Sequence, residues 1–423
     1  MRGELRKVGL MNDRAIGEGY IYLLGRALVV RQEHIDRGAA DFAFNRIKYN
    51  PLGTADFVNP NFDVAYLEAW IGVDPQTPAI LEVPRIEGRY YTAQILDEWG
   101  EVITNINERI FPSKPCGKFA LVYPNSSAPI PADTGRIELH SAKAKLLGRV
   151  ELKGDPDGAV ALQEAFRLNS LGTPTIADAA PMPLFGNDEL IGVDIFDTVE
   201  AVLASALDVS PIAASMQQQV RAIAARIAGD ADERARVDAL IRETIVPRFK
   251  QYVFTQSGPY RNHWVGGAAA GNYGSDFHMR GAINYAGIWA NNIGEVTYYV
   301  AMKDADGQPL DGDNAYAIHF PPDQLPDTVV DAYWSVILVD RTDFRVVPND
   351  LKRYNFNNHS PLAKEADGSL KIGIGAAPVA GISESNWLPA AAGKPFSLTF
   401  RTYVPREIVR TGGWSPPVVT RVN

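Results

Sequence analysis

The sequence predicts a mainly β protein with a helical segment, in which two antiparallel β-sandwich or jelly-roll domains flank the helices. Between Tyr49 and Leu152, short segments rich in Val, Ile, Tyr and Phe alternate with Pro, Gly, Asn and Asp. After Gly154 the apolar residues recur at helical spacing, and strand-like segments return after Gly281. Short strands separated by turn residues every eight to twelve positions are typical of sandwiches and barrels.

Composition indicates a folded protein with more than one domain. The chain has 423 residues, of which 46% are hydrophobic, and this is enough apolar material for a sizeable core. Its 50 acidic and 41 basic residues are spread along the chain, without a basic run that would follow a phosphate backbone. We therefore expect no nucleic-acid partner. Cys116 is the only cysteine, which excludes an internal disulfide and a Cys-rich metal site.

Changes in residue pattern divide the chain into four regions. We predict an N-terminal helix within residues 1–40, a β-domain over 41–153, a helical linker region over 154–280 and a second β-domain over 281–423. In the first region the apolar positions between Ala15 and Arg37 fall on one helical face. In the third, Ser210 before Pro211 is typical of a helix start, and the segment from Gly172 to Gly186 is expected to be a loop.

The N-terminal region shows no targeting or membrane segment. Residues Met1 to Leu10 are mixed and charged, and the apolar stretch that follows is interrupted by Gly25 and Arg26. We therefore expect no membrane span, and a cytoplasmic location for the chain as given, or a periplasmic one if a leader was removed. The amphipathic helix and the exposed strand edges of a sandwich are compatible with a homodimer.

Several strings in both halves of the chain resemble one bacterial family. They are NPNFDVAYLEAWIGV (Asn59 to Val73), LEVPRIEGRYYTAQILDEW (Leu81 to Trp99), ADGQPLDGDNAYAIHFPPDQLP, AYWSVILVD, PFSLTFRTYVP and WSPPVV. The chain thus resembles a bacterial family whose members consist of domain of unknown function 1254 followed by domain of unknown function 1214. The resemblance implies a β-sandwich or jelly roll at each end with helices between them, and it implies no known reaction. Val64 departs from the family pattern, in which threonine is common.

Three charged residues of the first β-domain are candidates for a polar site. Alternate residues of a strand share a face, so Arg89, Tyr91 and Asp97 are expected on one side, with Asp63 on a neighbouring segment. An arginine beside a carboxylate would hold an anionic substrate or shift the pKa of an acid or base. The alternative is a structural ion pair between Arg89 and Asp97 at a domain seam.

His278 is the candidate for a general base. It follows Asp276 by two residues in a Gly-rich stretch, where an extended backbone would direct both side chains to one side. The alternative is a hydrogen-bonded histidine between domains. The histidines show no metal-ligand spacing, and serine-hydrolase, P-loop and dinucleotide motifs are absent, so we expect neither a metal nor a cofactor.

We carry two hypotheses of function. The first is an enzyme of hydrolase or lyase type that acts on a small organic molecule in an interdomain cleft. Its catalytic candidates are Asp63, Arg89, Asp97 and His278, and its substrate-binding candidates are Tyr66, Tyr91, Arg280 and Trp387. The second is a non-catalytic ligand-binding or envelope-associated protein with an aromatic surface, for which the candidates are Trp334, Trp387, Trp414, Tyr403 and Phe400; the alternative for these aromatic residues is the core.

Overall fold

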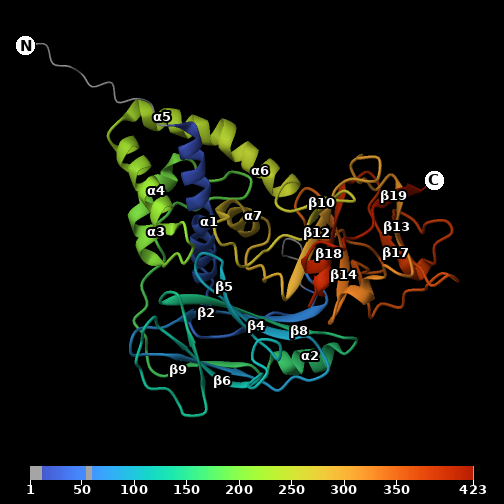
Figure 1. Cartoon of the computed structure of the whole chain (residues 1–423), viewed down its shortest axis with the longest axis horizontal. Coiled ribbons are helices and arrows are strands. Elements are labelled where there is room, and N and C mark those ends of the chain that lie inside the picture. The colour runs from blue at the N-terminus through green and yellow to red at the C-terminus, as the bar shows by residue number, and fades with distance from the viewer. Residues whose placement is uncertain (1–11, 54–59, 423) are drawn as a thin grey trace, which may run out of the picture.

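The computed structural model describes residues 12–53 and 60–422, and in it the chain forms three parts (Figure 1). The first β part comprises the early strands, the helical part packs above it, and the second β part is built from the C-terminal strands. The N-terminal helix α1 lies among helices from the middle of the chain, so the helical part is assembled from two distant segments.

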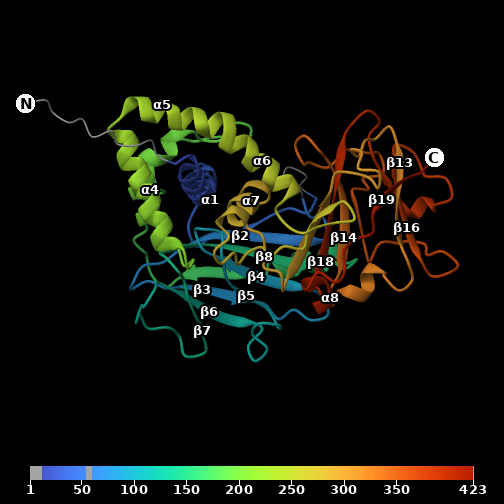
Figure 2. The same cartoon turned by 45° about the horizontal axis from the view of Figure 1, so that its top comes forward.

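The first β part contains two sheets packed face to face (Figure 2). The five-stranded sheet has the order β1 (Lys48–Tyr49), β2 (Val64–Gly72), β8 (Lys143–Glu151), β4 (Tyr91–Leu96) and β5 (Val102–Ile106). The four-stranded sheet has the order β7 (Gly135–Glu138), β6 (Gly117–Val122), β3 (Ala79–Val83) and β9 (Arg167–Ser170). Every second residue of the central strands enters one apolar core between the sheets.

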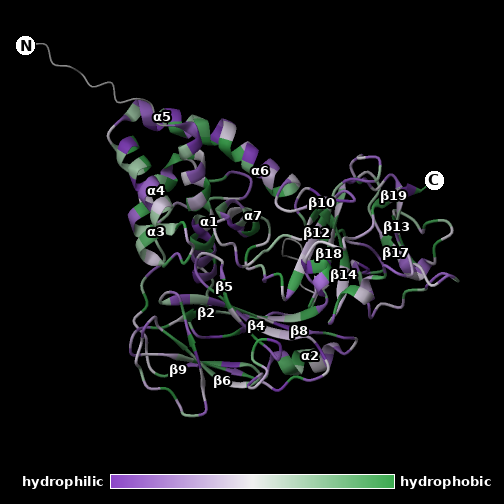
Figure 3. Ribbon diagram, in the orientation of Figure 1, coloured by the Kyte–Doolittle hydropathy of each residue, from purple (hydrophilic) through white to green (hydrophobic). Residues whose placement is uncertain are grey.

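The helical part encloses α1 (Asp13–Arg37), most of whose residues are buried. Around it lie the 3-10 helix Val193–Thr198, α3 (Val199–Ser205), α4 (Ala213–Ala228), α5 (Ala231–Leu240), the π-helical turn Ile241–Ile245, α6 (Val246–Thr255) and α7 (Phe277–Ala286). Apolar and polar residues alternate along α4 and α5 in Figure 3. Their apolar residues pack inward with those of α1, as expected of amphipathic helices around a shared core.

The second β part also contains two sheets. The six-stranded sheet has the order β10 (Tyr260–Arg261), β11 (Trp264–Gly266), β12 (Val296–Ala301), β18 (Phe396–Tyr403), β14 (Trp334–Asp340) and β15 (Asn355–Asn357). The four-stranded sheet has the order β17 (Trp387–Pro389), β16 (Leu370–Gly375), β13 (Ala315–Phe320) and β19 (Val419–Val422). The short helices α2 (Pro156–Gln163) and α8 (Glu407–Arg410) lie outside the helical part, against the first and second β parts respectively.

The fold class agrees with the sequence only at a coarse level. Helices and strands each make up 27% of the chain, so the protein is mixed and not mainly β. Two sheets are mixed, because β7 runs parallel to β6 and β17 runs parallel to β16, and the other two are antiparallel. Within the described residues none of the four sheets closes into a barrel. Two antiparallel sandwich or jelly-roll domains remain a prediction.

The region predicted as a helical linker, residues 154–280, contains strands that belong to both β parts. β9, within the region predicted as helical linker, pairs with β3 of the first β part. β10 and β11 precede residue 281 and pair into the six-stranded sheet of the second β part. Short strands flanked by helices carry too weak a periodicity to be assigned from the sequence.

Two of the three local predictions from the sequence, a helix and a loop, agree with the structure, and the third, a helix start, does not. The helix predicted from Ala15 to Arg37 and the loop at 172–186 are confirmed. The helix start at Ser210 is wrong, because the helix begins at Ala213 and the Ser210 hydroxyl makes no hydrogen bond within the described residues. The predictions for residues 1–10 lie outside the described residues.

The turn at residues 97–101 joins the first β part to the helical part. It connects β4 to β5, and its Trp99 is fully buried in the core that surrounds α1. The indole ring lies 5.1 Å from the ring of Tyr22, and its Nε1 donates to the carbonyl of Ala206 at 3.3 Å. A side chain from a β-hairpin therefore completes the core of a helical bundle.

We predict that Trp99→Ala destabilises the whole chain. Truncating a fully buried tryptophan removes apolar contacts and leaves a cavity, which costs about 3–5 kcal/mol. The measurement is the free energy of unfolding by chemical denaturation. Leu171→Ala is the control, since this leucine is largely exposed and should change stability by less than about 0.5 kcal/mol. Equal effects of the two substitutions would contradict the role of Trp99.

Candidate functional site

Each β part turns one polar sheet face toward the other. In the first, Tyr66, Arg149 and Thr92 lie side by side across β2, β8 and β4, on the face opposite the apolar core. In the second, Tyr298, Arg401 and Ser335 lie side by side across β12, β18 and β14. We call the region between these two rows the junction seam. Polar sheet faces are normally solvated, so their burial here calls for a specific explanation.

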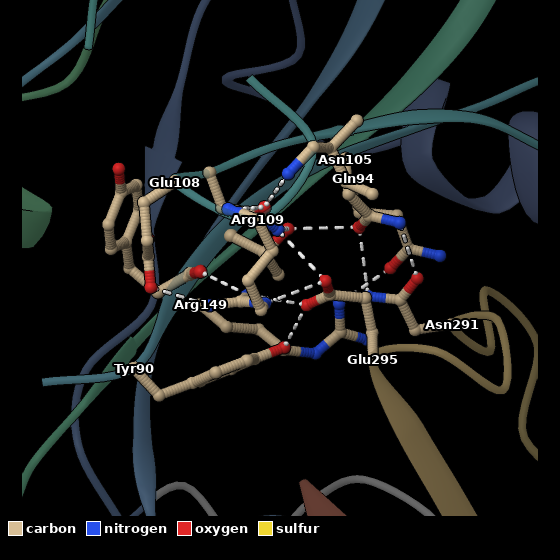
Figure 4. A network of polar contacts seen from close by, with 12 residues as sticks. Tyr90, Gln94, Asn105, Glu108, Arg109, Arg149, Asn291 and Glu295 are labelled. Atoms are coloured by element: carbon tan, nitrogen blue, oxygen red, sulfur yellow. Dashed lines mark hydrogen bonds and ion pairs between the residues drawn. The ribbon is translucent and has the colours of Figure 1, made fainter. Parts of the chain in front are cut away.

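Glu295 ties the two β parts together (Figure 4). It lies just before β12, and its Oε2 accepts hydrogen bonds from Arg109 at 2.7 Å and from the Tyr90 hydroxyl at 3.1 Å. Its Oε1 accepts from Arg109 Nε at 3.1 Å and from the Asn107 amide at 3.0 Å. Four donors occupy the accepting positions of this carboxylate. Glu295 therefore holds the two sides of the seam together.

Amide side chains continue this network toward Arg149 (Figure 4). Asn105 and Asn291 exchange two hydrogen bonds of 3.0 Å each, and Asn105 also accepts from Thr92 at 2.9 Å. Gln94 donates to the carbonyl of Ala290 at 2.9 Å. These bonds connect β4 and β5 to the segment that leads into β12, so the wall of the seam is held in one geometry.

Arg149 carries a charge for which the described residues show no ion pair with a carboxylate. It is buried, and it donates to two neutral acceptors, Gln94 Oε1 at 2.5 Å and the Trp289 carbonyl at 3.5 Å. Its guanidinium lies 5.4 Å from the ring centre of Tyr66. Burial lowers the pKa of Arg149, but the nearby tyrosines outweigh this effect and the net shift is upward. The guanidinium therefore stays charged at every physiological pH.

Tyrosines from both β parts surround the seam. Tyr333 and Tyr403 stack with ring centres 4.1 Å apart, and Tyr90 packs edge-on against both. Burial raises the pKa of each of these three phenols, so they remain neutral. Tyr66 and Tyr298 are only half-buried. Neutral phenols next to a buried cation can donate hydrogen bonds to an anion.

Asp63 lies at the seam between the two β parts. Its Oδ1 accepts hydrogen bonds from the amides of Asn355 and Asn357, each at 2.7 Å. Burial raises the pKa of its carboxyl group. Because both donors belong to the second β part, Asp63 joins the two β parts. Tyr66, a predicted binding residue, lies in the same seam beside Arg149.

Arg89 and Tyr91 line a separate surface hollow of about 260 Å³. Arg89 forms an ion pair of 2.8 Å with Asp155, and the described residues show no ion pair between Arg89 and Asp97. The Tyr91 hydroxyl donates to the carbonyl of Pro115 at 2.9 Å. The guanidinium of Arg89 thus anchors the chain before α2, and Asp97 finds other partners.

Asp97 orients His140, a residue that the sequence did not single out. Its Oδ2 lies 2.7 Å from His140 Nδ1, while its Oδ1 accepts from the backbone amides of Trp99 at 2.8 Å and Glu101 at 2.9 Å. The His140 side chain keeps 27% of its surface exposed. A buried carboxylate bonded to one ring nitrogen of a partly exposed histidine is an arrangement that supports general-base chemistry.

His278 and Arg280 belong to α7, in the helical part. The extended segment expected around His278 is not present, because Asp276 caps the helix and accepts from the amide of Met279 at 2.9 Å. The imidazole packs against Tyr252, and burial lowers its pKa. Arg280 is buried and pairs with Asp208 at 3.0 Å. Both residues hold the helical part together in this arrangement.

Trp387 lies in β17 of the second β part, where its Nε1 donates to the Gly375 carbonyl at 2.9 Å. No hydrogen bond, ion pair or ring contact within residues 12–53 and 60–422 joins any two of Asp63, Arg89, Asp97 and His278. Asp63 and Arg89 are nevertheless linked through the backbone of Leu152, whose amide donates to the Asp63 carbonyl at 2.8 Å and whose carbonyl accepts from Arg89 at 3.4 Å. Asp97 and His278 have other partners.

Comparison with known families matches both halves of the chain. Residues 41–170 match DUF1254, and residues 295–407 match DUF1214, each described as a protein family of unknown function. The chain therefore carries both of these domains of unknown function, in this order. The tie at Glu295 thus connects the first residue of the DUF1214 match to Tyr90, Asn107 and Arg109 of DUF1254.

The chain is also similar to solved structures. The crystal structure of the VPA0106 protein from Vibrio parahaemolyticus is 19% identical, with a TM-score of 0.68 over 98% of this chain and 100% of that one. An uncharacterized protein from Burkholderia cenocepacia is 15% identical, with a TM-score of 0.47 over 99% of this chain and 92% of that one. The first likeness shows a shared fold. A search of curated proteins finds no match.

Two further findings concern membranes and metals. Of the helices in the described part of the chain, none has the length and apolar character needed to cross a bilayer. Across the same residues, His, Cys, Asp and Glu side chains nowhere gather in a group of three that could hold a metal ion.

We predict that stability falls as the pH rises from about 4.5 to about 7. Burial raises the pKa of Glu98 and that of Glu101, each from 4.5 to about 7. In this window the folded chain holds protons that the unfolded chain has lost, so each glutamate lowers the unfolding free energy by up to about 1.4 kcal/mol per pH unit.

The measurement is the free energy of unfolding at a series of pH values and constant ionic strength. The double variant Glu98→Gln, Glu101→Gln should have a flatter profile between these pH values. A wild-type profile that rises through this window would show that the two carboxyl groups are ionised in the folded chain.

Proposed function

We propose that this protein binds a small organic anion at the junction seam, with Arg149 as the group that holds the anion. The observation that carries the proposal is a buried guanidinium whose hydrogen-bond partners, Gln94 and Trp289, are both neutral. Burying a charge without an opposite charge is costly, and an arginine in such a place is often completed by a ligand.

The surroundings of Arg149 support a carboxylate or phosphate ligand. Such a ligand can accept two parallel hydrogen bonds from one guanidinium. The half-buried Tyr66 and Tyr298 lie near the guanidinium and offer hydroxyl donors and aromatic surface. Glu295 and Asp63 are engaged by donors of the protein itself, so neither is needed to neutralise Arg149. This arrangement favours binding over catalysis at the seam.

We also make proposals about the type of β fold, the oligomeric state and the location of the protein. We infer that each β part is a β-sandwich, since the apolar faces of two sheets share one core in each. A homodimer, and a periplasmic location for a chain that has lost a leader, remain proposals. Sedimentation of the purified chain and fractionation of the cells that produce it test them.

We predict that Arg149→Met removes anion binding without unfolding the protein. Calorimetric titration with acetate, benzoate, succinate and inorganic phosphate should find at least one anion that binds the wild type. The affinity should fall by about tenfold to a hundredfold in the variant, because a charge-assisted hydrogen bond contributes about 1.5–3 kcal/mol. The thermal midpoint without ligand should change little, since methionine fills similar volume and brings no charge.

Arg85→Met is the matched control, because Arg85 is exposed and lies outside the seam. Arg149→Lys keeps the charge and loses the planar fork, so its affinity should be intermediate. Unchanged affinity in both Arg149 variants, or no binding of any of the four anions to the wild type, would refute the proposal.

The pairing of Asp97 with His140 favours a second candidate function, an enzyme of hydrolase or lyase type. In that case His140 would act as the base and Asp97 would orient it. We predict that His140→Gln and Asp97→Asn each lower the turnover of an ester or hydroxy-acid substrate by at least about a hundredfold. His263→Gln is the control, as the ring of this histidine lies 3.0 Å from the Tyr260 hydroxyl, outside the Asp97–His140 pair. Turnover that survives in both His140→Gln and Asp97→Asn would rule out this role.

A further inference from the structure

A second hollow lies in the second β part, away from the junction seam. It has a volume of about 120 Å³ and is lined by the first strands of the six-stranded sheet and the segment after α8. Its lining residues include Arg261, Trp264, Gly267, Tyr299 and Trp414. None of them belongs to the contacts of Glu295 or Arg149 described above, so this hollow is an independent feature.

Aromatic rings form the walls of this hollow. Trp264, Tyr299 and Trp414 are all buried, and the rings of Tyr299 and Trp414 meet edge to face with centres 6.1 Å apart. Gly267 completes the wall in a left-handed conformation with φ of +75°, and a Cβ there would lie 3.3 Å from the ring of Tyr299. Glycine thus keeps the backbone close to the ring without filling the hollow.

Two buried donors at this hollow have no partner. The indole Nε1 of Trp414 and the hydroxyl of Tyr299 make no hydrogen bond anywhere in the described residues. By contrast, the indole of Trp264 donates to the carbonyl of Pro417 at 2.8 Å. Burial raises the pKa of Tyr299 to about 12, so its hydroxyl keeps its proton at neutral pH. Unpaired buried donors are rare in folded proteins and often mark a site for a missing acceptor.

The charge of the hollow is positive. Arg261 lines it and donates to the Gly412 carbonyl, and no acidic side chain is among the lining residues. Arg261 also acts on the Tyr299 phenol, whose pKa it lowers against the larger effect of burial. An acceptor that enters the hollow would meet two neutral donors and a guanidinium, and it would meet no competing carboxylate.

We propose that this hollow binds a small carboxylate that carries one aromatic ring. The ring would lie among Trp264, Tyr299 and Trp414, and the carboxylate would accept from the Trp414 indole, the Tyr299 hydroxyl and Arg261. Edge-to-face packing favours a flat ring over a branched aliphatic chain. The donor-only lining favours an anion over an alcohol or an amine.

The test uses phenylacetate and its neutral amide, phenylacetamide, titrated into the full-length protein and followed by tryptophan fluorescence and calorimetry. We expect saturable binding of phenylacetate and at least about tenfold weaker binding of phenylacetamide. Trp414→Phe and Tyr299→Phe each remove one donor and keep the ring, so each should weaken phenylacetate binding about tenfold. Tyr260→Phe is the matched control, because its phenol lies outside the hollow and it should bind as the wild type does.

The thermal midpoint of the variants shows whether a donor such as the Tyr299 hydroxyl serves a ligand or stabilises the fold. Removing an unpaired buried donor relieves a desolvation cost, so Tyr299→Phe should keep or raise the thermal midpoint while it loses affinity. Loss of stability together with unchanged affinity would overturn the assignment. So would phenylacetate binding that disappears in Arg149→Met and persists in Trp414→Phe, because the ligand would then occupy the junction seam. Absence of phenylacetate binding to the wild type at millimolar concentration would overturn it as well.

Discussion

The two hydrogen bonds between Arg109 and Glu295 are the contact on which the arrangement of the two β parts depends. Both bonds connect a DUF1254 side chain to the residue that begins the DUF1214 match. Tyr90 and Asn107 complete the coordination of the same carboxylate, so the polar faces of two sheets are held at one separation. Arg149 lies on one of these faces, between Tyr66 of β2 and Thr92 of β4.

The buried basic side chains of this protein have two kinds of surroundings. Near α1, Lys143 lies 2.7 Å from Glu33, and Arg26 lies 3.2 Å from Glu98, so each of these buried cations has a carboxyl group beside it. Such networks hold structure in place. Arg149 differs because only neutral acceptors surround it in the described chain. The contrast within one protein supports the proposal that an external anion binds at the seam and not in the helical part.

The sequence predicted features that depend on neighbours along the chain, and it missed those that depend on contacts across it. Strand alternation correctly predicted that Tyr91 and Tyr90 face opposite sides: Tyr91 lies in the apolar core of the first β part, and Tyr90 lies in the seam. The pairing of Asp97 with His140 spans 43 residues and follows no known spacing. Asp276 was interpreted as a partner of a histidine, although a carboxylate before a helix more often caps it. Glu295 gave no signal, since a single glutamate before a strand has no distinctive local pattern.

The hairpin of β4 and β5 has a mechanical consequence for the whole molecule. Its strands supply Gln94 and Asn105 to the seam, while its tip inserts Trp99 into the helical core about α1. One continuous, hydrogen-bonded ribbon therefore spans both contacts. Movement of the second β part away from the first would break the hydrogen bonds of Gln94 and Asn105 to the segment before β12. The same movement would pull on the hairpin that carries Trp99, so the contact between the β parts and the packing of the helical core are mechanically connected.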